Sequence, residues 1–162
     1  LPKDLHWRLV HVGGGERREA LRAQGARLGL SARIDWRGAL PQEQVLALYR
    51  SADLFVLASR IARDGDRDGL PNVLMEAASQ KLPILTTNVS AIPEFITDGV
   101  HGTLVAPGDS RALADAIIAL AADPARRAAM AEAAYQRLTT SFGMEAGIET
   151  VDTRLRAALA QA

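Results

Sequence analysis

Two acidic residues and a turn that contains glycine and proline stand close together near the middle of the chain. The segment reads Asp68-Gly69-Leu70-Pro71-Asn72-Val73-Leu74-Met75-Glu76. Gly69 lets the backbone approach a ligand closely, and Pro71 is preorganised for the first turn of a helix. The first amides of a helix have no partner within it and lie at the positive end of its dipole. The turn therefore predicts an anion site that would fit a diphosphate.

The helix that follows this turn places its second acid where it can act on a ligand. At 3.6 residues per turn, one arc of the helix is polar and the opposite arc is apolar. The polar arc holds Asn72, Glu76, Ser79 and Gln80, and the apolar arc holds Val73, Leu74, Ala77 and Ala78. A carboxylate beside a diphosphate would repel it. We therefore expect Glu76 to accept hydrogen bonds from sugar hydroxyls, such as those of a ribose.

Continuous apolar runs alternate along the chain with segments in which apolar residues recur at helical spacing. Five runs predict strands, at 6–12, 33–36, 54–58, 83–87 and 103–105. Helices are predicted up to about residue 29, over 42–52 and 71–81, in a short turn at 92–96, and in three segments after Ser110. This alternation predicts an α/β domain: a parallel sheet of about five strands, helices on both faces and a helical C-terminal tail. Ligands of such sheets bind beyond the carboxyl ends of the strands, which is where the acidic segment lies.

Composition excludes several classes of protein. A chain of 162 residues fits one domain, and 19 basic residues balance 19 acidic ones, so we expect no nucleic-acid partner. The sequence has no cysteine, which excludes disulfides and thiolate metal sites, and we expect no metal cofactor. No apolar run reaches the roughly 18 residues of a membrane span. We therefore expect a cytoplasmic protein.

The chain starts at Leu1, with a strand pattern almost at once. This start predicts that the sequence is part of a longer protein.

Short motifs are spread over nearly the whole chain. They are Gly13-Gly14-Gly15, Arg37-Gly38, Ala52 to Phe55 leading to Ser59, the acidic segment, Lys81 to Ile84, Pro93-Glu94, Asp98-Gly99 with Gly102, and Pro107-Gly108-Asp109. In this order they resemble the C-terminal donor-binding domain of the family 4 glycosyltransferases of the GT-B type. The resemblance implies that residues 1–162 form one Rossmann-like domain that binds a nucleotide sugar.

The resemblance also implies roles for single residues. The family has two glutamates separated by seven residues; the first lies near the donor sugar and the second binds the ribose. Glu76 matches the second, and Asp68, one methylene shorter, stands in place of the first. Gly69, Leu70, Pro71 and Asn72 keep the phosphate loop of the pattern.

Further residues are candidates for contact with the donor. Gly13, Gly14 and Ser59 are expected near the nucleotide sugar, although the glycines could merely end a strand, and Ser59 and Asn72 could be turn or capping residues. Arg60 and Arg63 precede the phosphate site and are candidate donor contacts, or else part of a solvated loop.

The implied activity is that of a retaining glycosyltransferase. Such an enzyme moves a sugar from a nucleoside diphosphate to an acceptor hydroxyl in glycan, polysaccharide or glycolipid biosynthesis. The resemblance places the acceptor domain and the basic residues that neutralise the leaving diphosphate upstream of Leu1. The isolated chain is then expected to be inactive, and the full-length protein could touch the inner face of the cell membrane.

Other functions remain open at this point. The chain could be a non-catalytic module that binds a nucleotide sugar, or part of a nucleotide-sugar epimerase. A nicotinamide-dependent dehydrogenase is a third alternative, because a glycine-rich turn follows the first strand and Asp35 comes about twenty residues later. The third glycine of that fingerprint would fall at Arg18, where a bulky side chain obstructs helix–strand packing.

Overall fold

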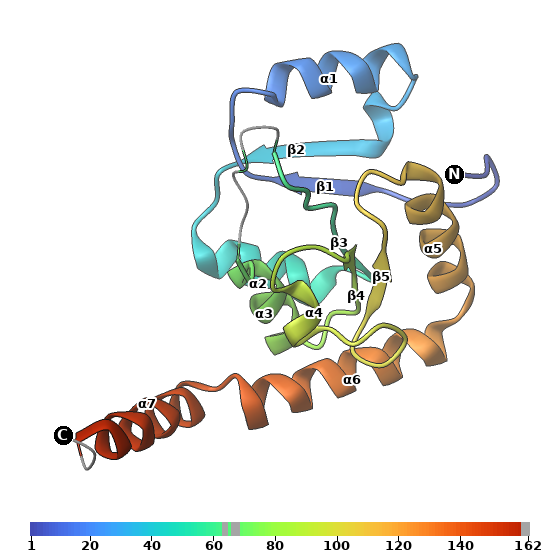
Figure 1. The fold of residues 1–162 in the computed structure, drawn as a ribbon. Coiled ribbons are helices and arrows are strands. Elements are labelled where there is room, and N and C mark those ends of the chain that lie inside the picture. Colours follow the sequence, from blue (N-terminus) through green and yellow to red (C-terminus); the bar gives the residue numbers. More distant parts are fainter. Residues whose placement is uncertain (63–64, 66–68, 160–162) are drawn as a thin grey trace. The chain divides into compact units, whose positions relative to one another are not determined.

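The computed structural model describes residues 1–62, 65 and 69–159, which form two compact units, Leu1–Leu48 and Tyr49–Ala162 (Figure 1). The strands are β1 (Leu9–Val12), β2 (Ile34–Gly38), β3 (Phe55–Leu57), β4 (Ile84–Thr87) and β5 (Thr103–Val105). The helices are α1 (Arg18–Arg27), the 3-10 turn η1 (Ser31–Arg33), α2 (Gln42–Ser51), α3 (Asn72–Ser79), α4 (Ile92–Phe95), α5 (Ser110–Ala122), α6 (Pro124–Ser141) and α7 (Met144–Leu159). These elements confirm the predicted α/β class, with five strands in the described part of the chain.

The first unit pairs two parallel strands and packs one helix against them. β1 and β2 run parallel, with Leu9 opposite Ile34. Gly25 of α1 is buried, and a β-carbon at its position would lie 3.4 Å from Cδ1 of Ile34. The buried face of α1 at Gly25 therefore packs against Ile34 of β2.

The second unit is built on three parallel strands in the order β3-β4-β5. Val56 pairs with Leu85, and Leu85 pairs in turn with Thr103, so β4 is the central strand. All four residues of β4 are buried, as expected for a parallel strand that is covered on both faces.

Two hydrophobic clusters cover the two faces of this sheet. Neighbouring residues of a strand point to opposite faces, and Ile84 and Leu85 belong to different clusters. The cluster of Ile84 includes residues of α3 and α4, whereas the cluster of Leu85 includes Leu120 of α5. Helices therefore pack on both faces of the sheet, as the sequence predicted.

Helices form the C-terminal part of the chain, which confirms the predicted helical tail. The Asp109 carboxylate accepts a hydrogen bond from the Ala112 amide at 2.8 Å and caps α5. Asp123 caps α6 in the same way, through the Arg126 amide at 2.9 Å, and Pro124 follows it in the first turn. No helix of the described residues is both long and apolar enough to cross a membrane.

Gly102 precedes β5 at a point where the backbone passes very close to β4. A β-carbon there would lie 2.7 Å from the carbonyl oxygen of Ile84 and 3.2 Å from Cγ2 of Ile96. We expect Gly102→Ala to lower the free energy of unfolding by roughly 1–3 kcal/mol, because buried backbone and a packed side chain must move. Urea denaturation followed by circular dichroism measures this change.

Gly147→Ala is the control, because a β-carbon at Gly147 meets no atom within 4 Å. Its stability should stay equal to that of the wild type or rise slightly, since alanine favours the helical conformation. Equal stability of the Gly102→Ala variant would contradict the close approach of these strands.

Candidate functional site

Helix α3 presents the acidic residue of the predicted site. Leu74, Ala77 and Ala78 are fully buried, Glu76 is half-buried and Asn72 is exposed. Leu74, Ala77 and Ala78 are thus buried as predicted for the apolar arc, whereas Val73 of the same arc is half-buried, as Glu76 is. The helix begins at Asn72 rather than Pro71, because Pro71 has an extended ψ of 124°. Pro71 is therefore the N-cap, and it has no side-chain acceptor for the first amides of α3.

The other end of α3 is fixed by a tight hydrogen-bonded turn. The Lys81 amide donates to the Ala78 carbonyl at 3.0 Å, and the Leu82 amide donates to the Ala77 carbonyl at 3.1 Å. Lys81 has a φ of 53°, the left-handed conformation that ends many helices in this way. The turn limits α3 to eight residues and returns the chain to β4.

Glu76 of α3 lies near enough to Tyr49 of α2 for its charge to act on the phenol. Burial raises the pKa of the Tyr49 phenol, and the negative charge of Glu76 raises that pKa further. The Tyr49 ring packs edge-on against Phe55 of β3, with 5.4 Å between the ring centroids. In the described part of the chain, the Glu76 side chain has no hydrogen bond or ion pair. It is thus a half-buried acceptor with open capacity for a ligand's hydroxyl groups.

Buried threonines tie the carboxyl ends of β3 and β4 together. The Thr87 hydroxyl donates to the Ser59 carbonyl at 2.6 Å, and the Thr86 hydroxyl donates to the Leu57 carbonyl at 2.9 Å. Both threonines are almost completely buried. The backbone at Ser59 is therefore held at the edge of the sheet where ligands of parallel sheets bind.

A hollow of about 330 Å³ opens beyond this same edge. Its lining follows all three strands: Arg60 and Ile61 come after β3, Val89 after β4, and Pro107 and Gly108 after β5. Among the described residues, Arg60 has no ion pair. The hollow thus combines an apolar wall with one unpaired cation, which suits a ligand with an anionic group.

The glycine loop lies in the first unit, whereas the other described candidates lie in the second. Gly13 and Gly15 have positive φ values of 126° and 118°, so the loop needs glycine at both positions. The Gly13 amide donates to the Gly38 carbonyl at 2.8 Å. The loop therefore ends β1 beside the end of β2, and Gly14 lies exposed between these two glycines.

The first unit does not fit a nicotinamide dinucleotide. The half-buried Arg18 occupies the third glycine position of the fingerprint, and its guanidinium lies over Gly38. Asp35, which would bind the ribose, forms ion pairs with Arg8 at 3.0 Å and Arg37 at 2.8 Å. A bulky side chain therefore stands where the fingerprint needs glycine, and the carboxylate that would bind the ribose is already paired.

Some predicted residues come together and others lie outside the described part of the chain. Gly69, Leu70, Pro71 and Asn72 lead directly into the helix of Glu76. Asp68 and Arg63 lie outside the described residues, so their roles stay predictions. The described residues contain no group of three or more acidic or histidine side chains that could hold a metal ion.

Sequence reasoning missed Tyr49 and Thr87. Nothing in the sequence around Tyr49 points to Glu76, because the two residues lie 27 positions apart and come near each other only in the folded chain. Thr87 carried a signal, because a polar residue at the end of an otherwise apolar strand needs a buried hydrogen-bond partner.

Comparisons with known proteins agree on one family. Residues 1–137 match the model of "Glycosyl transferases group 1". The amylovoran biosynthesis glycosyltransferase AmsK of Erwinia amylovora is 38% identical over 105 residues, which are 65% of this chain and 26% of that protein. The chain thus spans about a quarter of that relative's length.

Two solved structures have a fold similar to that of this chain. HepE of Anabaena in complex with UDP has a TM-score of 0.78 at 22% identity, over 96% of this chain and 41% of that one. The C-terminal domain of the group 1 glycosyltransferase LpcC of Francisella tularensis has a TM-score of 0.73 at 26% identity, over 85% of this chain and 71% of that one.

The Thr87 hydroxyl should contribute measurably to the stability of this edge. We expect Thr87→Val to lower the free energy of unfolding by about 1 kcal/mol, because the hydrogen bond to the half-buried Ser59 carbonyl would be lost while the volume stays similar. Thermal and urea denaturation measure the loss.

The matched control is Thr140→Val, on the exposed surface of α6, where the hydroxyl donates to the Gln136 carbonyl at 2.8 Å. Its stability should change by less than about 0.5 kcal/mol. Equal effects of the two substitutions would show that the Thr87 bond does not hold the strand ends.

Proposed function

Since this chain belongs to the group 1 glycosyltransferases, we propose that it is the donor-binding part of a retaining enzyme that uses a nucleoside diphosphate sugar. The acceptor is a hydroxyl group of a growing polysaccharide or glycolipid. The proposal assigns the acceptor site to another domain of a longer protein, because the chain spans only 26% of AmsK. Contact with a membrane surface would then be made through the longer protein.

The position of Glu76 carries this proposal. Its carboxylate is half-buried and unpaired among the described residues, and it lies one turn into α3. A diphosphate bound at the first amides of α3 leaves the nucleotide's ribose within reach of this acceptor. Two vicinal hydroxyls can donate to one carboxylate, and charge-assisted bonds of this kind are about twice as strong as neutral ones.

The first turn of α3 supplies the phosphate contacts. Gly69 and Leu70 lead to Pro71, and the amides that follow Pro71 point away from the helix body. Their partial positive charge stabilises the negative charge that collects on the diphosphate as the glycosidic bond breaks. Stabilisation of the leaving group in this way lowers the barrier to transfer.

Two charged side chains complete the proposed site. Asp68 precedes the phosphate loop and is assigned to the donor sugar, where its carboxylate would accept hydroxyl hydrogen bonds. Arg60 borders the hollow at the carboxyl ends of the strands and is assigned to an anionic group of the donor. Neither role requires a metal ion, and the proposal includes none.

The donor site is tested by titrating the chain with UDP, GDP and ADP in a calorimeter. We expect one of these to bind weakly, and Glu76→Ala to weaken that binding about tenfold or more, because a charged acceptor of the ribose hydroxyls is lost. Glu76→Gln keeps the shape but loses the charge, so its loss should be smaller.

Glu94→Gln is the matched control, since Glu94 is an exposed acid of α4. Its affinity should equal that of the wild type. Unchanged affinity of the Glu76→Ala variant would remove Glu76 from the site. Binding of a nicotinamide cofactor without any response to the three diphosphates would support the dehydrogenase alternative instead.

The contribution of Arg60 should depend on salt. We expect Arg60→Ala to weaken binding of the preferred diphosphate by roughly two- to fivefold at low ionic strength and by less at 0.5 M salt, because exposed charges are screened. Arg111→Ala is the control, on a residue of α5 whose side chain is 92% exposed. Equal losses for the two variants would indicate a general charge effect.

A further inference from the structure

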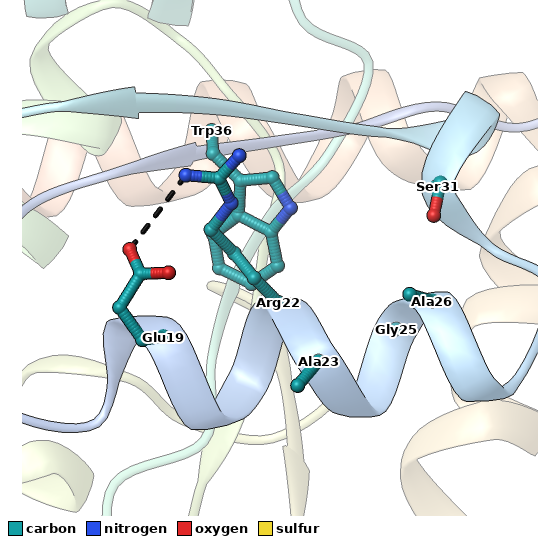
Figure 2. Close-up of a pocket in the computed structure, with 7 residues that line it drawn as sticks. All are labelled: Glu19, Arg22, Ala23, Gly25, Ala26, Ser31 and Trp36. Carbon is teal, nitrogen blue, oxygen red and sulfur yellow. Dashed lines mark ion pairs between the residues drawn. The ribbon is translucent and has the colours of Figure 1, made fainter.

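A groove of about 400 Å³ lies in the first unit, along the side of α1 that faces β2 and η1 (Figure 2). It is called the α1 groove here. Its lining comprises Trp36 of β2, Ser31 of η1, and Glu19, Arg22, Ala23, Gly25 and Ala26 of α1. None of these residues belongs to the proposed donor site.

The groove exists because the helix carries small residues at this point. Gly25 has no side chain, and its buried side faces Ile34 of β2. Ala23 and Ala26 end at their methyl groups and do not reach across to the strand. The indole of Trp36 forms a half-buried wall of the groove, and in the view of Figure 2 the side chain of Arg22 extends from α1 in front of it.

Polar groups lie at the rim of this aromatic wall. Glu19 and Arg22 form an ion pair, with 3.6 Å between Oε1 and Nη1. Both side chains are at least half exposed, and Figure 2 shows Glu19 toward one end of the groove, Arg22 in front of Trp36, and Ser31 toward the other end. The rim thus offers a carboxylate acceptor, the guanidinium of Arg22 as a donor, and a hydroxyl. Because the two charged groups are paired, the rim carries no net charge.

We propose that the α1 groove binds a neutral glycan. A pyranose ring has one face of C–H groups, which packs on an indole, and an equator of hydroxyls, which bond to paired donors and acceptors. The groove offers a partner for each of these features: the indole for the C–H face, and the polar groups of the rim for the hydroxyls. A volume of about 400 Å³ suits one or two sugar rings, within the range of small-molecule sites.

A nucleobase is the rival ligand, because a base would also pack against Trp36. A base has two flat π faces and polar groups only in the plane of its ring, whereas the rim presents an ion-paired carboxylate and guanidinium in one place and a hydroxyl in another. Several separated hydroxyl partners favour a sugar. The experiment therefore includes a nucleoside arm.

Intrinsic fluorescence can report binding at this groove, because the chain has only two tryptophans, Trp7 and Trp36. The Arg33 guanidinium lies 5.2 Å from the centroid of the Trp7 ring, and Trp7 does not line the groove. The Trp7→Phe variant leaves Trp36 as the sole fluorophore. The probes are three linear tetrasaccharides, of α-1,4-linked glucose, β-1,4-linked glucose and α-1,6-linked mannose, with uridine and adenosine as the rival arm.

We expect at least one tetrasaccharide to shift the Trp36 emission to shorter wavelength, with a dissociation constant on the order of 1 mM. Ala26→Leu should weaken this binding at least fivefold, because the larger side chain fills the groove. Ala20→Leu is the matched control, an exposed position of the same helix outside the groove, and should leave the binding unchanged. Calorimetry on the unaltered protein repeats the measurement without the Trp7 substitution.

The proposal is overturned if no tetrasaccharide binds, if Ala20→Leu and Ala26→Leu have the same effect, or if a nucleoside shifts the emission and the sugars do not. The Glu76→Ala variant separates this inference from the donor site. It should lose diphosphate affinity and keep the response of Trp36 to the tetrasaccharide.

Discussion

Complete burial of strand β4 is the constraint on which the second unit depends. A parallel strand that is covered on both faces can expose polar groups only beyond its ends. Ile84 and Leu85 therefore belong to separate hydrophobic clusters, and helices must pack on both sides of the sheet. Polar residues can therefore contact a ligand only from segments outside the buried strands. Glu76 and Arg60 both lie on such segments, after the end of β3.

The hydrogen bonds at the ends of the strands give this arrangement its rigidity. Thr86 and Thr87 carry hydroxyls into a region that would otherwise be apolar, and each hydroxyl binds a carbonyl of the segment that includes β3. A buried donor without a partner costs more than the bond itself contributes, so these groups hold one geometry. The backbone from Leu57 to Ser59 is therefore fixed before any ligand arrives.

The periodicity of the sequence predicts features that depend on a single helix or strand. It does not predict features that depend on how two elements pack together. The 3.6-residue repeat correctly placed Leu74, Ala77 and Ala78 in the core, and the apolar runs found the five strands. The pairing of those strands into a β1-β2 ladder and a β3-β4-β5 ladder cannot be read from the runs themselves. The proximity of Tyr49 to Glu76 and the α1 groove also arise only from packing, since alanines on a helix look the same whether or not they leave a hollow.

Helix α3 is terminated at both ends, which limits insertions and deletions in related sequences. The helix has a proline cap before Asn72 and a left-handed residue at Lys81, so it cannot absorb an extra residue at either end. One insertion between Asn72 and Glu76 would rotate the carboxylate by about 100° and turn it toward the core. Relatives that keep this acid should therefore tolerate insertions and deletions before Gly69 but almost none between Pro71 and Leu82.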